Sequence, residues 1–184
     1  MAHLTEAGIL LFAESANYVC LCQKHECLLL SYIAILILYS NFIYLSKRKR
    51  LSSHRQACRF YAANYNKAMT ACGRCRVRQC DVSDLPFAAG SFDLATAFET
   101  IYFWPGLERC FAQVEKVLKQ GGYFLICNES DGMDATGRKF EDIIDGMICY
   151  TPEQIEAALK KAGFSEVTKE HHPNKPWITV LARK

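Results

Sequence analysis

Acidic and amide side chains stand directly after three stretches of the sequence that have strand-like patterns. Asp81 follows the first stretch, Glu99 follows the second, and Asn128 and Glu129 follow the third. Open α/β sheets bind their ligands beyond the carboxyl ends of their strands, and carboxylates there accept hydrogen bonds from ligand groups. For Asp81 the alternative is a structural one, in which the side chain only caps a loop. The sequence therefore predicts a ligand site at one edge of a sheet.

The cysteines are the other side chains that could do chemistry, and the chain has 10 of them. Cys72, Cys75 and Cys80 form the one cluster, but no second pair or histidine completes the four ligands of a structural metal site. No secretory cleavage pattern precedes the cysteines, so reduced thiols in a cytosolic setting are expected. We predict that the protein holds no structural metal.

Alternating helical and strand patterns position these residues. Apolar residues recur at steps of three and four before Gly73 and again from Leu107 to Leu118. Thr151, Pro152 and Gln154 indicate an N-cap, a first helical turn and a capping box. The predicted helices cover 58–72, 107–118 and 152–162, and the predicted strands cover 74–80, 92–98, 123–127, 166–170 and 177–182. This order favours a mainly parallel α/β sheet that ends in an antiparallel hairpin.

The charge distribution divides the chain. Residues 27–80 carry ten Lys or Arg and no Asp or Glu, whereas residues 81–184 carry eleven basic and sixteen acidic side chains. Such a composition break separates segments of different origin or environment. We therefore distinguish an atypical N-terminal segment, residues 1–54, from a regular domain, residues 55–184.

An uncharged stretch covers residues 28–45 and is followed by the basic run 47–50. Its length is near the lower limit for a membrane-spanning helix, and the basic run would place residues 55–184 in the cytoplasm. The alternative is a buried strand or helix of a soluble core. Nucleic-acid binding is not expected, because a solvated end to a hydrophobic segment explains the basic run more simply.

Three motifs together resemble the class I methyltransferases that use S-adenosylmethionine (AdoMet). The segment Asp81-Val82-Ser83-Asp84-Leu85-Pro86-Phe87, followed by Phe92-Asp93, is similar to the "D-x-x-x-LPF, then FD" signature of the small-molecule members. The turn from Leu118 to Gly122 resembles the "VLKPGG" turn of the family, with Gln in place of Pro. The resemblance implies a Rossmann-like fold, AdoMet as cofactor and a small-molecule substrate.

The resemblance also implies roles for individual residues. Asp81 would accept a hydrogen bond from the adenine amino group while the Val82 backbone meets the ring, and Phe98 and Glu99 would line the methyl-donor pocket. The substrate would lie near Tyr102, Trp104, Asn128 and Glu129. Aromatic rings beside a sulfonium are favourable by cation–π attraction, although such rings more often pack a helix onto a sheet. Glu129 would orient a nucleophile or face water.

The front of the chain departs from the family pattern. The family has a glycine-rich loop after its first strand and an acidic residue about twenty positions later, whereas the one glycine before Gly73 here is Gly8. The resemblance therefore predicts a domain truncated at its N-terminal side. Two functions follow: a small-molecule methyltransferase with impaired AdoMet binding, or a non-catalytic membrane-anchored remnant of a methyltransferase domain.

Overall fold

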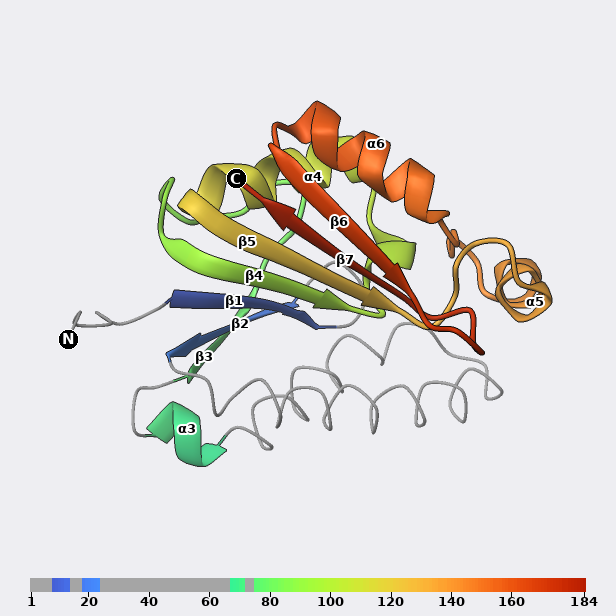
Figure 1. Ribbon diagram of the computed structural model, residues 1–184. Helices are drawn as coiled ribbons and strands as arrows, with labels where there is room; N and C mark the ends of the chain where they lie inside the picture. Colours follow the sequence, from blue (N-terminus) through green and yellow to red (C-terminus); the bar gives the residue numbers. More distant parts are fainter. Residues whose placement is uncertain (1–7, 14–17, 24–66, 72–74) are drawn as a thin grey trace.

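The computed structural model describes residues 8–13, 18–23, 67–71 and 75–184 of the chain. They form one seven-stranded sheet with the strand order β3-β2-β1-β4-β5-β7-β6 and several helices (Figure 1). The strands are β1 (Gly8–Ala13), β2 (Tyr18–Gln23), β3 (Cys75–Gln79), β4 (Phe92–Phe98), β5 (Leu118–Asn128), β6 (Glu166–His171) and β7 (Ile178–Arg183). The helices are α3 (Lys67–Ala71), the 3-10 turn η1 (Ile101–Phe103), α4 (Leu107–Val117), α5 (Ala135–Ile143) and α6 (Pro152–Ala162).

The sheet is mixed, which corrects the expectation of a mainly parallel sheet. Strand β4 pairs in parallel with both β1 and β5. All other neighbouring pairs, β1 with β2, β2 with β3, β5 with β7 and β6 with β7, are antiparallel. The predicted hairpin of β6 and β7 is confirmed. The unexpected antiparallel pairs lie on the β3 side of the sheet, where β2 is antiparallel to both β1 and β3.

Strands β1 and β2 come from the N-terminal segment that the composition sets apart, and the sequence patterns did not predict them. They pair in an antiparallel register from Gly8 opposite Gln23 to Ala13 opposite Tyr18. Leu10, the β1 side chain that the structure describes, is fully buried and belongs to the main hydrophobic core. The sheet is therefore seven strands wide, and the expected N-terminal truncation is not confirmed.

Helices α4 and α6 cover one face of the sheet, and Figure 1 shows α3 on the opposite side. The core beneath α4 and α6 is rich in aromatic rings. Trp104 stacks on Phe124 with ring centroids 6.1 Å apart, and Phe111 meets Phe124 edge to face at 5.5 Å. Edge-to-face and offset pairs of this kind are the favourable arrangements of aromatic quadrupoles. This packing fixes η1 and α4 against β5.

Local sequence signals account for the two helices that follow β5. Thr151 caps α6: its hydroxyl accepts from the backbone N–H of Gln154 at 3.3 Å, and the Gln154 side chain accepts from the Thr151 N–H at 2.9 Å. The α6 helix ends at Gly163, whose φ of 106° suits glycine. Asp134 caps α5 by accepting from the Gly137 N–H at 2.7 Å.

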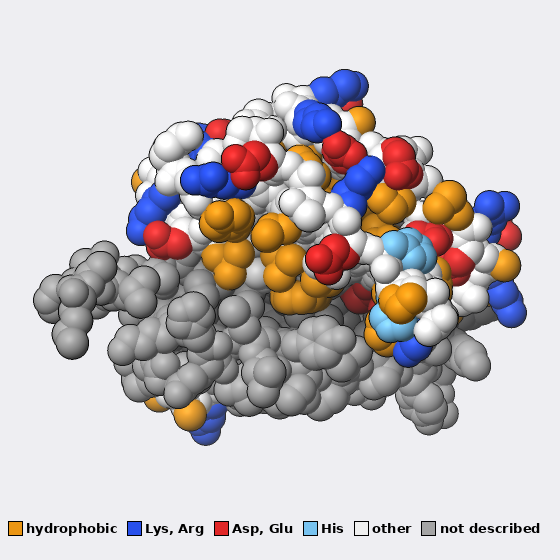
Figure 2. Space-filling view, in the orientation of Figure 1, with side chains coloured by type: hydrophobic (Ala, Val, Ile, Leu, Met, Phe, Trp, Pro, Cys, Tyr) orange, Lys and Arg blue, Asp and Glu red, His pale blue; other side chains and the backbone are white. Residues whose placement is uncertain are grey.

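The molecular surface differs between the helices and the sheet. Figure 2 shows charged side chains gathered over the helical layer, with a strip of hydrophobic side chains beneath it. Tyr123 of β5 and Leu181 of β7 are exposed hydrophobic residues on the strands. No helix among the described residues is long and apolar enough to cross a membrane. Residues 28–45 lie outside the described part of the chain, so the proposed membrane segment stays a prediction.

Candidate functional site

Three strand ends meet at one edge of the sheet, as the sequence predicts. Because β1, β4 and β5 are parallel, and β3 is antiparallel to the reversed β2, the carboxyl ends of β3, β4 and β5 lie at the same edge. Asp81, Glu99 and Glu129 follow these ends. Strands β3 and β4 are three strand spacings apart, which is about 14 Å. The edge is thus wide enough to divide into two sites.

The position of Asp81 is compatible with both of its predicted roles, ligand binding and loop capping. Its Oδ1 accepts a hydrogen bond from the Ser83 N–H at 2.8 Å, which is the structural loop cap. This hydrogen bond lowers the pKa of the carboxyl. The side chain is exposed, so a ligand can reach the carboxylate. The Val82 side chain is fully buried, so only the Val82 backbone is left to face a ligand.

Glu99 is held in an unusual backbone conformation. Its φ is 55°, and it is the one non-glycine residue with positive φ in the described part of the chain. Such conformations cost about 1–3 kcal/mol and cluster at ligand sites. Its Oε1 accepts from the Glu129 N–H at 2.5 Å. In this conformation the Glu99 carboxyl reaches the backbone N–H of Glu129, just after β5.

Burial raises the pKa of the Glu99 carboxyl to about 8, although hydrogen bonds from the Glu129 N–H and the Tyr102 hydroxyl lower it. The raised pKa favours the protonated form of Glu99 near neutral pH. A cation placed beside the carboxyl would favour the ionised form and lower the pKa. The charge state of Glu99 is therefore coupled to whatever occupies the space next to it.

That space is a cavity of about 190 Å³ between the ends of β4 and β5, α5, and the loop that joins β6 to β7. Tyr102 is a buried residue of its lining and accepts a hydrogen bond from the Ser130 N–H at 3.2 Å. The described lining residues are Glu99, Tyr102, Glu129, Ser130, Asp134, Thr136, Gly137, Phe140, Met147, Pro176 and Trp177.

The structure places the other predicted residues around this cavity or in the core. Trp104 is 3% exposed and packs among core rings, and it is not among the residues that line the cavity. Phe98 is buried at the end of β4. Asn128 is 2% exposed, and neither its amide oxygen nor its amide nitrogen has a hydrogen-bond partner among the described residues. Of the four predicted substrate residues, Tyr102 and Glu129 line the cavity.

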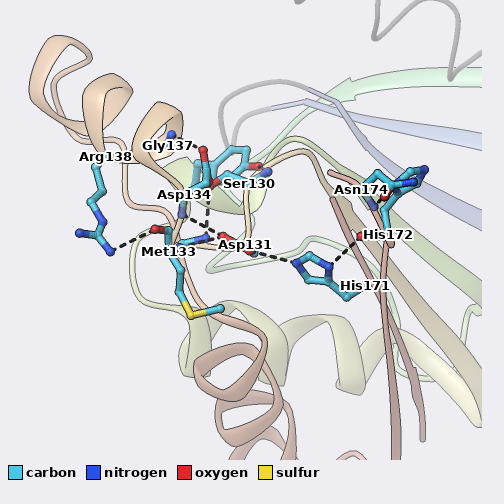
Figure 3. Close-up of polar contacts among 11 residues, drawn as sticks. Ser130, Asp131, Met133, Asp134, Gly137, Arg138, His171, His172 and Asn174 are labelled. Carbon is cyan, nitrogen blue, oxygen red and sulfur yellow. Dashed lines mark hydrogen bonds and ion pairs between the residues drawn. The ribbon is translucent and has the colours of Figure 1, made fainter. Parts of the chain in front are cut away.

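A polar network beside the cavity was not predicted from the sequence. The Ser130 hydroxyl donates to Asp134 Oδ2 at 2.5 Å, and Asp131 Oδ1 accepts from the N–H groups of Met133 and Asp134 (Figure 3). Asp131 Oδ2 meets His171 Nε2 at 3.0 Å. Since Asp131 follows β5 and His171 ends β6, this contact ties the two walls of the cavity together.

The pKa shifts of this pair have opposite signs. The hydrogen bond to Asp131 raises the pKa of His171. Burial acts to raise the pKa of Asp131, but hydrogen bonds from His171, Met133 and Asp134 outweigh burial, and the pKa is lowered. Each partner thus favours the charged form of the other.

The cysteine cluster is partly described. Cys75 begins β3, Cys80 follows it, and Cys72 lies outside the described residues. Burial raises the pKa of the Cys80 thiol to about 11, which keeps it protonated, whereas metal ligation needs the thiolate. That the cysteines hold no metal stays a prediction.

Comparison with known proteins finds a likeness to methyltransferases. Residues 47–126 match the model of a family described as a methyltransferase domain. Over these residues the chain is similar to AdoMet-dependent methyltransferases. A sterol methyltransferase-like protein of Botryococcus braunii is 35% identical over 95 residues, and a sterol 24-C-methyltransferase of Schizosaccharomyces pombe is 29% identical over 119 residues.

These matches cover only parts of the relatives. The first spans 47% of this chain and 24% of the Botryococcus protein, and the second spans 55% of this chain and 30% of the yeast protein. Among solved structures, a methyltransferase of Thermotoga maritima described as a possible histamine N-methyltransferase has a TM-score of 0.51 and 21% identity. That match covers 57% of this chain and 62% of the other. At this identity the structural likeness shows the methyltransferase fold alone.

The chain departs from the methyltransferase pattern at the junction of β1 and β2. Class I methyltransferases have a glycine-rich loop there, leading into a helix. Here Ala13 ends β1 and Tyr18 begins the antiparallel β2, and the four residues between them include no glycine. Gly8 lies at the start of β1, at the opposite edge of the sheet from Asp81 and Glu99. The sequence of this junction therefore lacks the glycine-rich loop.

Proposed function

We propose that this chain is an AdoMet-dependent methyltransferase that acts on a small molecule and binds AdoMet weakly. The observation that carries the proposal is the cavity beside Glu99, at the carboxyl ends of β4 and β5 in a methyltransferase sheet. Open α/β sheets bind ligands at this edge. The named sterol methyltransferase relatives support a small-molecule substrate, although each is matched over a third of its length or less.

The chain offers residues for two ends of AdoMet. The exposed Asp81 carboxylate would accept a hydrogen bond from the adenine amino group, and the Val82 backbone follows it in the chain. Phe98 and Glu99 would form the wall near the methyl group. AdoMet supplies an electrophilic methyl group on a positively charged sulfur. Glu99 would ionise beside such a cation and offer it negative charge, and the Tyr102 ring would offer an apolar wall.

The junction of β1 and β2 does not fit the middle of the cofactor. The four residues between Ala13 and Tyr18 include no glycine, so we do not expect the close backbone approach to the cofactor that a glycine-rich loop provides. Binding should be weak for this reason. The alternative function, a non-catalytic membrane-anchored remnant, depends on residues 28–45, which lie outside the described part of the chain. The cytoplasmic location of residues 55–184 also stays a prediction.

Transfer of a labelled methyl group tests the proposal. The full chain is incubated with methyl-labelled AdoMet at millimolar concentration and a panel of small amines, phenols and carboxylic acids, and the label in each extracted product is counted. We expect slow transfer to at least one acceptor class. Glu99→Gln should reduce this transfer about tenfold or more, because Gln cannot ionise when the cationic sulfur lies beside it.

Asp84→Asn provides the matched control, because Asp84 is an exposed carboxylate in the loop after β3 that does not line the cavity. It should leave transfer unchanged. Absence of transfer to every acceptor class at saturating AdoMet would refute the enzymatic proposal and favour the non-catalytic alternative.

A further inference from the structure

The cavity has an unusual combination of walls. Three aromatic rings, those of Tyr102, Phe140 and Trp177, face it together with the carboxyl groups of Glu99, Glu129 and Asp134. No Lys, Arg or His is among its described lining residues. Aromatic faces carry negative potential at their centres, so rings and carboxylates act in the same electrostatic direction. A cavity of this kind selects a cation.

The three carboxyl groups are not equally available. Both oxygens of Asp134 are used, by the Gly137 N–H and the Ser130 hydroxyl. Glu99 is engaged by the Glu129 N–H. The Glu129 carboxylate has no hydrogen-bond or ion-pair partner among the described residues, although it is partly buried. A partly desolvated carboxylate without a partner is stabilised by an incoming charge.

Trp177 is the ring of the cavity that already has a cation beside it. The Nζ of Lys175 lies 3.7 Å from the centre of the Trp177 ring, within the range of a cation–π contact. Lys175 therefore covers one face of the indole, and the apolar part of a ligand meets the rest of the ring. The indole is partly exposed and lines the cavity with Pro176.

The cavity is small for a ligand site. It measures about 190 Å³, whereas pockets for drug-sized ligands typically measure about 300–1,000 Å³. A small amine with one aromatic or short aliphatic group suits this volume, with its charge at the carboxylates and its apolar part against the rings.

We propose that this cavity binds a small organic ammonium ion, with its charge at Glu129 and Glu99 and its apolar part between Tyr102, Phe140 and Trp177. The inference deepens the proposed function and rests on it for one point only, that the bound amine is the methyl acceptor. AdoMet also carries an ammonium group, so the cofactor itself is the second source of this chemistry.

Intrinsic fluorescence of the full chain measures the binding. The sequence has two tryptophans, of which Trp104 is 3% exposed in the core and Trp177 lines the cavity. Phenethylamine is titrated at pH 7 under selective tryptophan excitation, in parallel with 2-phenylethanol, its uncharged analogue. We expect a saturable change with the amine and at least tenfold weaker binding of the alcohol. Trp177→Phe should remove most of the signal, because Trp104 is shielded.

Glu129→Gln identifies the carboxylate that receives the charge and should weaken amine binding about tenfold. Glu170→Gln is the matched control: Glu170 is exposed on β6 and outside the cavity, and the substitution changes the net charge equally. Thermal melting of each variant verifies that it folds. Equal binding of amine and alcohol, or equal effects of the two glutamate substitutions, would overturn the inference.

A final arm separates the two ammonium sources. If added AdoMet displaces phenethylamine competitively, the cavity receives the cofactor's ammonium group, and the assignment to the methyl acceptor is overturned. If both bind together, the assignment is supported. Amine binding without any methyl transfer would refute the proposed function alone, whereas transfer to uncharged acceptors without amine binding would refute this inference alone.

Discussion

The two sides of the sheet differ in how they follow the methyltransferase pattern. The side formed by β4, β5, β7 and β6 keeps the expected elements and carries the cavity at its edge. The side formed by β1, β2 and β3 keeps the positions of the strands but reverses β2 and joins it directly to β1. A strand can therefore occupy its usual position in the sheet while the connection that leads to it lacks the ligand-binding residues of the methyltransferase pattern.

The largest expected consequence concerns AdoMet. Loss of the contacts at the β1–β2 junction should weaken binding by about 3–6 kcal/mol, at about 1.5–3 kcal/mol for each of two hydrogen-bonded charged groups. We predict millimolar or undetectable binding by titration calorimetry, and loss of any residual binding in Asp81→Ala. Micromolar binding that Asp81→Ala leaves unchanged would show that the front of the chain builds a cofactor site of another kind.

A smaller effect tests whether β1 belongs to the sheet. Leu10 is fully buried, so Leu10→Ala should lower the free energy of unfolding by about 2–5 kcal/mol. Urea denaturation of the full chain measures it. Leu181→Ala is the control, because Leu181 is 38% exposed and its loss should cost much less. Equal effects of the two substitutions would contradict the position of β1 and remove the contrast between the two sides.

The smallest effect concerns the contact between Asp131 and His171. Asp131 favours protonated His171, so His171 contributes stability below its ordinary pKa of about 6.5 and loses it as the pH rises through the raised folded value. The lowered pKa of Asp131 gives a contribution above its ordinary value of about 3.9, lost as the pH falls through the folded value. The contact between Asp131 and His171 therefore stabilises the protein most between about pH 3.9 and pH 6.5.

Asp131→Asn tests this pair directly. In an NMR titration, the substitution should lower the pKa of the His171 imidazole toward its ordinary value. Asp142→Asn, at an exposed carboxylate of α5 that has no partner among the described residues, should not. An unchanged His171 titration in Asp131→Asn would mean that the contact does not form in solution.

The sequence predicted the elements whose signals are local. Thr151, Pro152 and Gln154 define the start of α6 within four residues, and all three act as expected. Strands β1 and β2 were not predicted, because the apolar run around Leu10 has meaning only beside β4, which lies far along the chain. The contact of Asp131 with His171 likewise joins residues 40 positions apart.

The site was predicted in outline for the same reason. Strand ends indicate which residues share an edge, so the cavity could be expected near Glu99 and Glu129. Which side chains face the cavity depends on packing that no local pattern encodes. Trp104 therefore lies in the core, while Phe140 and Trp177, which were not predicted, line the cavity.

The central place of β1 also bears on how the chain folds. Ile9 pairs with Leu94, a separation of 94 − 9 = 85 residues, whereas Gly8 to Ala13 and Tyr18 to Gln23 are neighbours in the chain. Because long-range pairing pays its loop-closure entropy before the contacts form, β1 should join the sheet late. During synthesis the hairpin leaves the ribosome long before β4 exists. The nascent chain must therefore keep an apolar strand soluble until its partner arrives, an interval in which a chaperone would find a natural substrate.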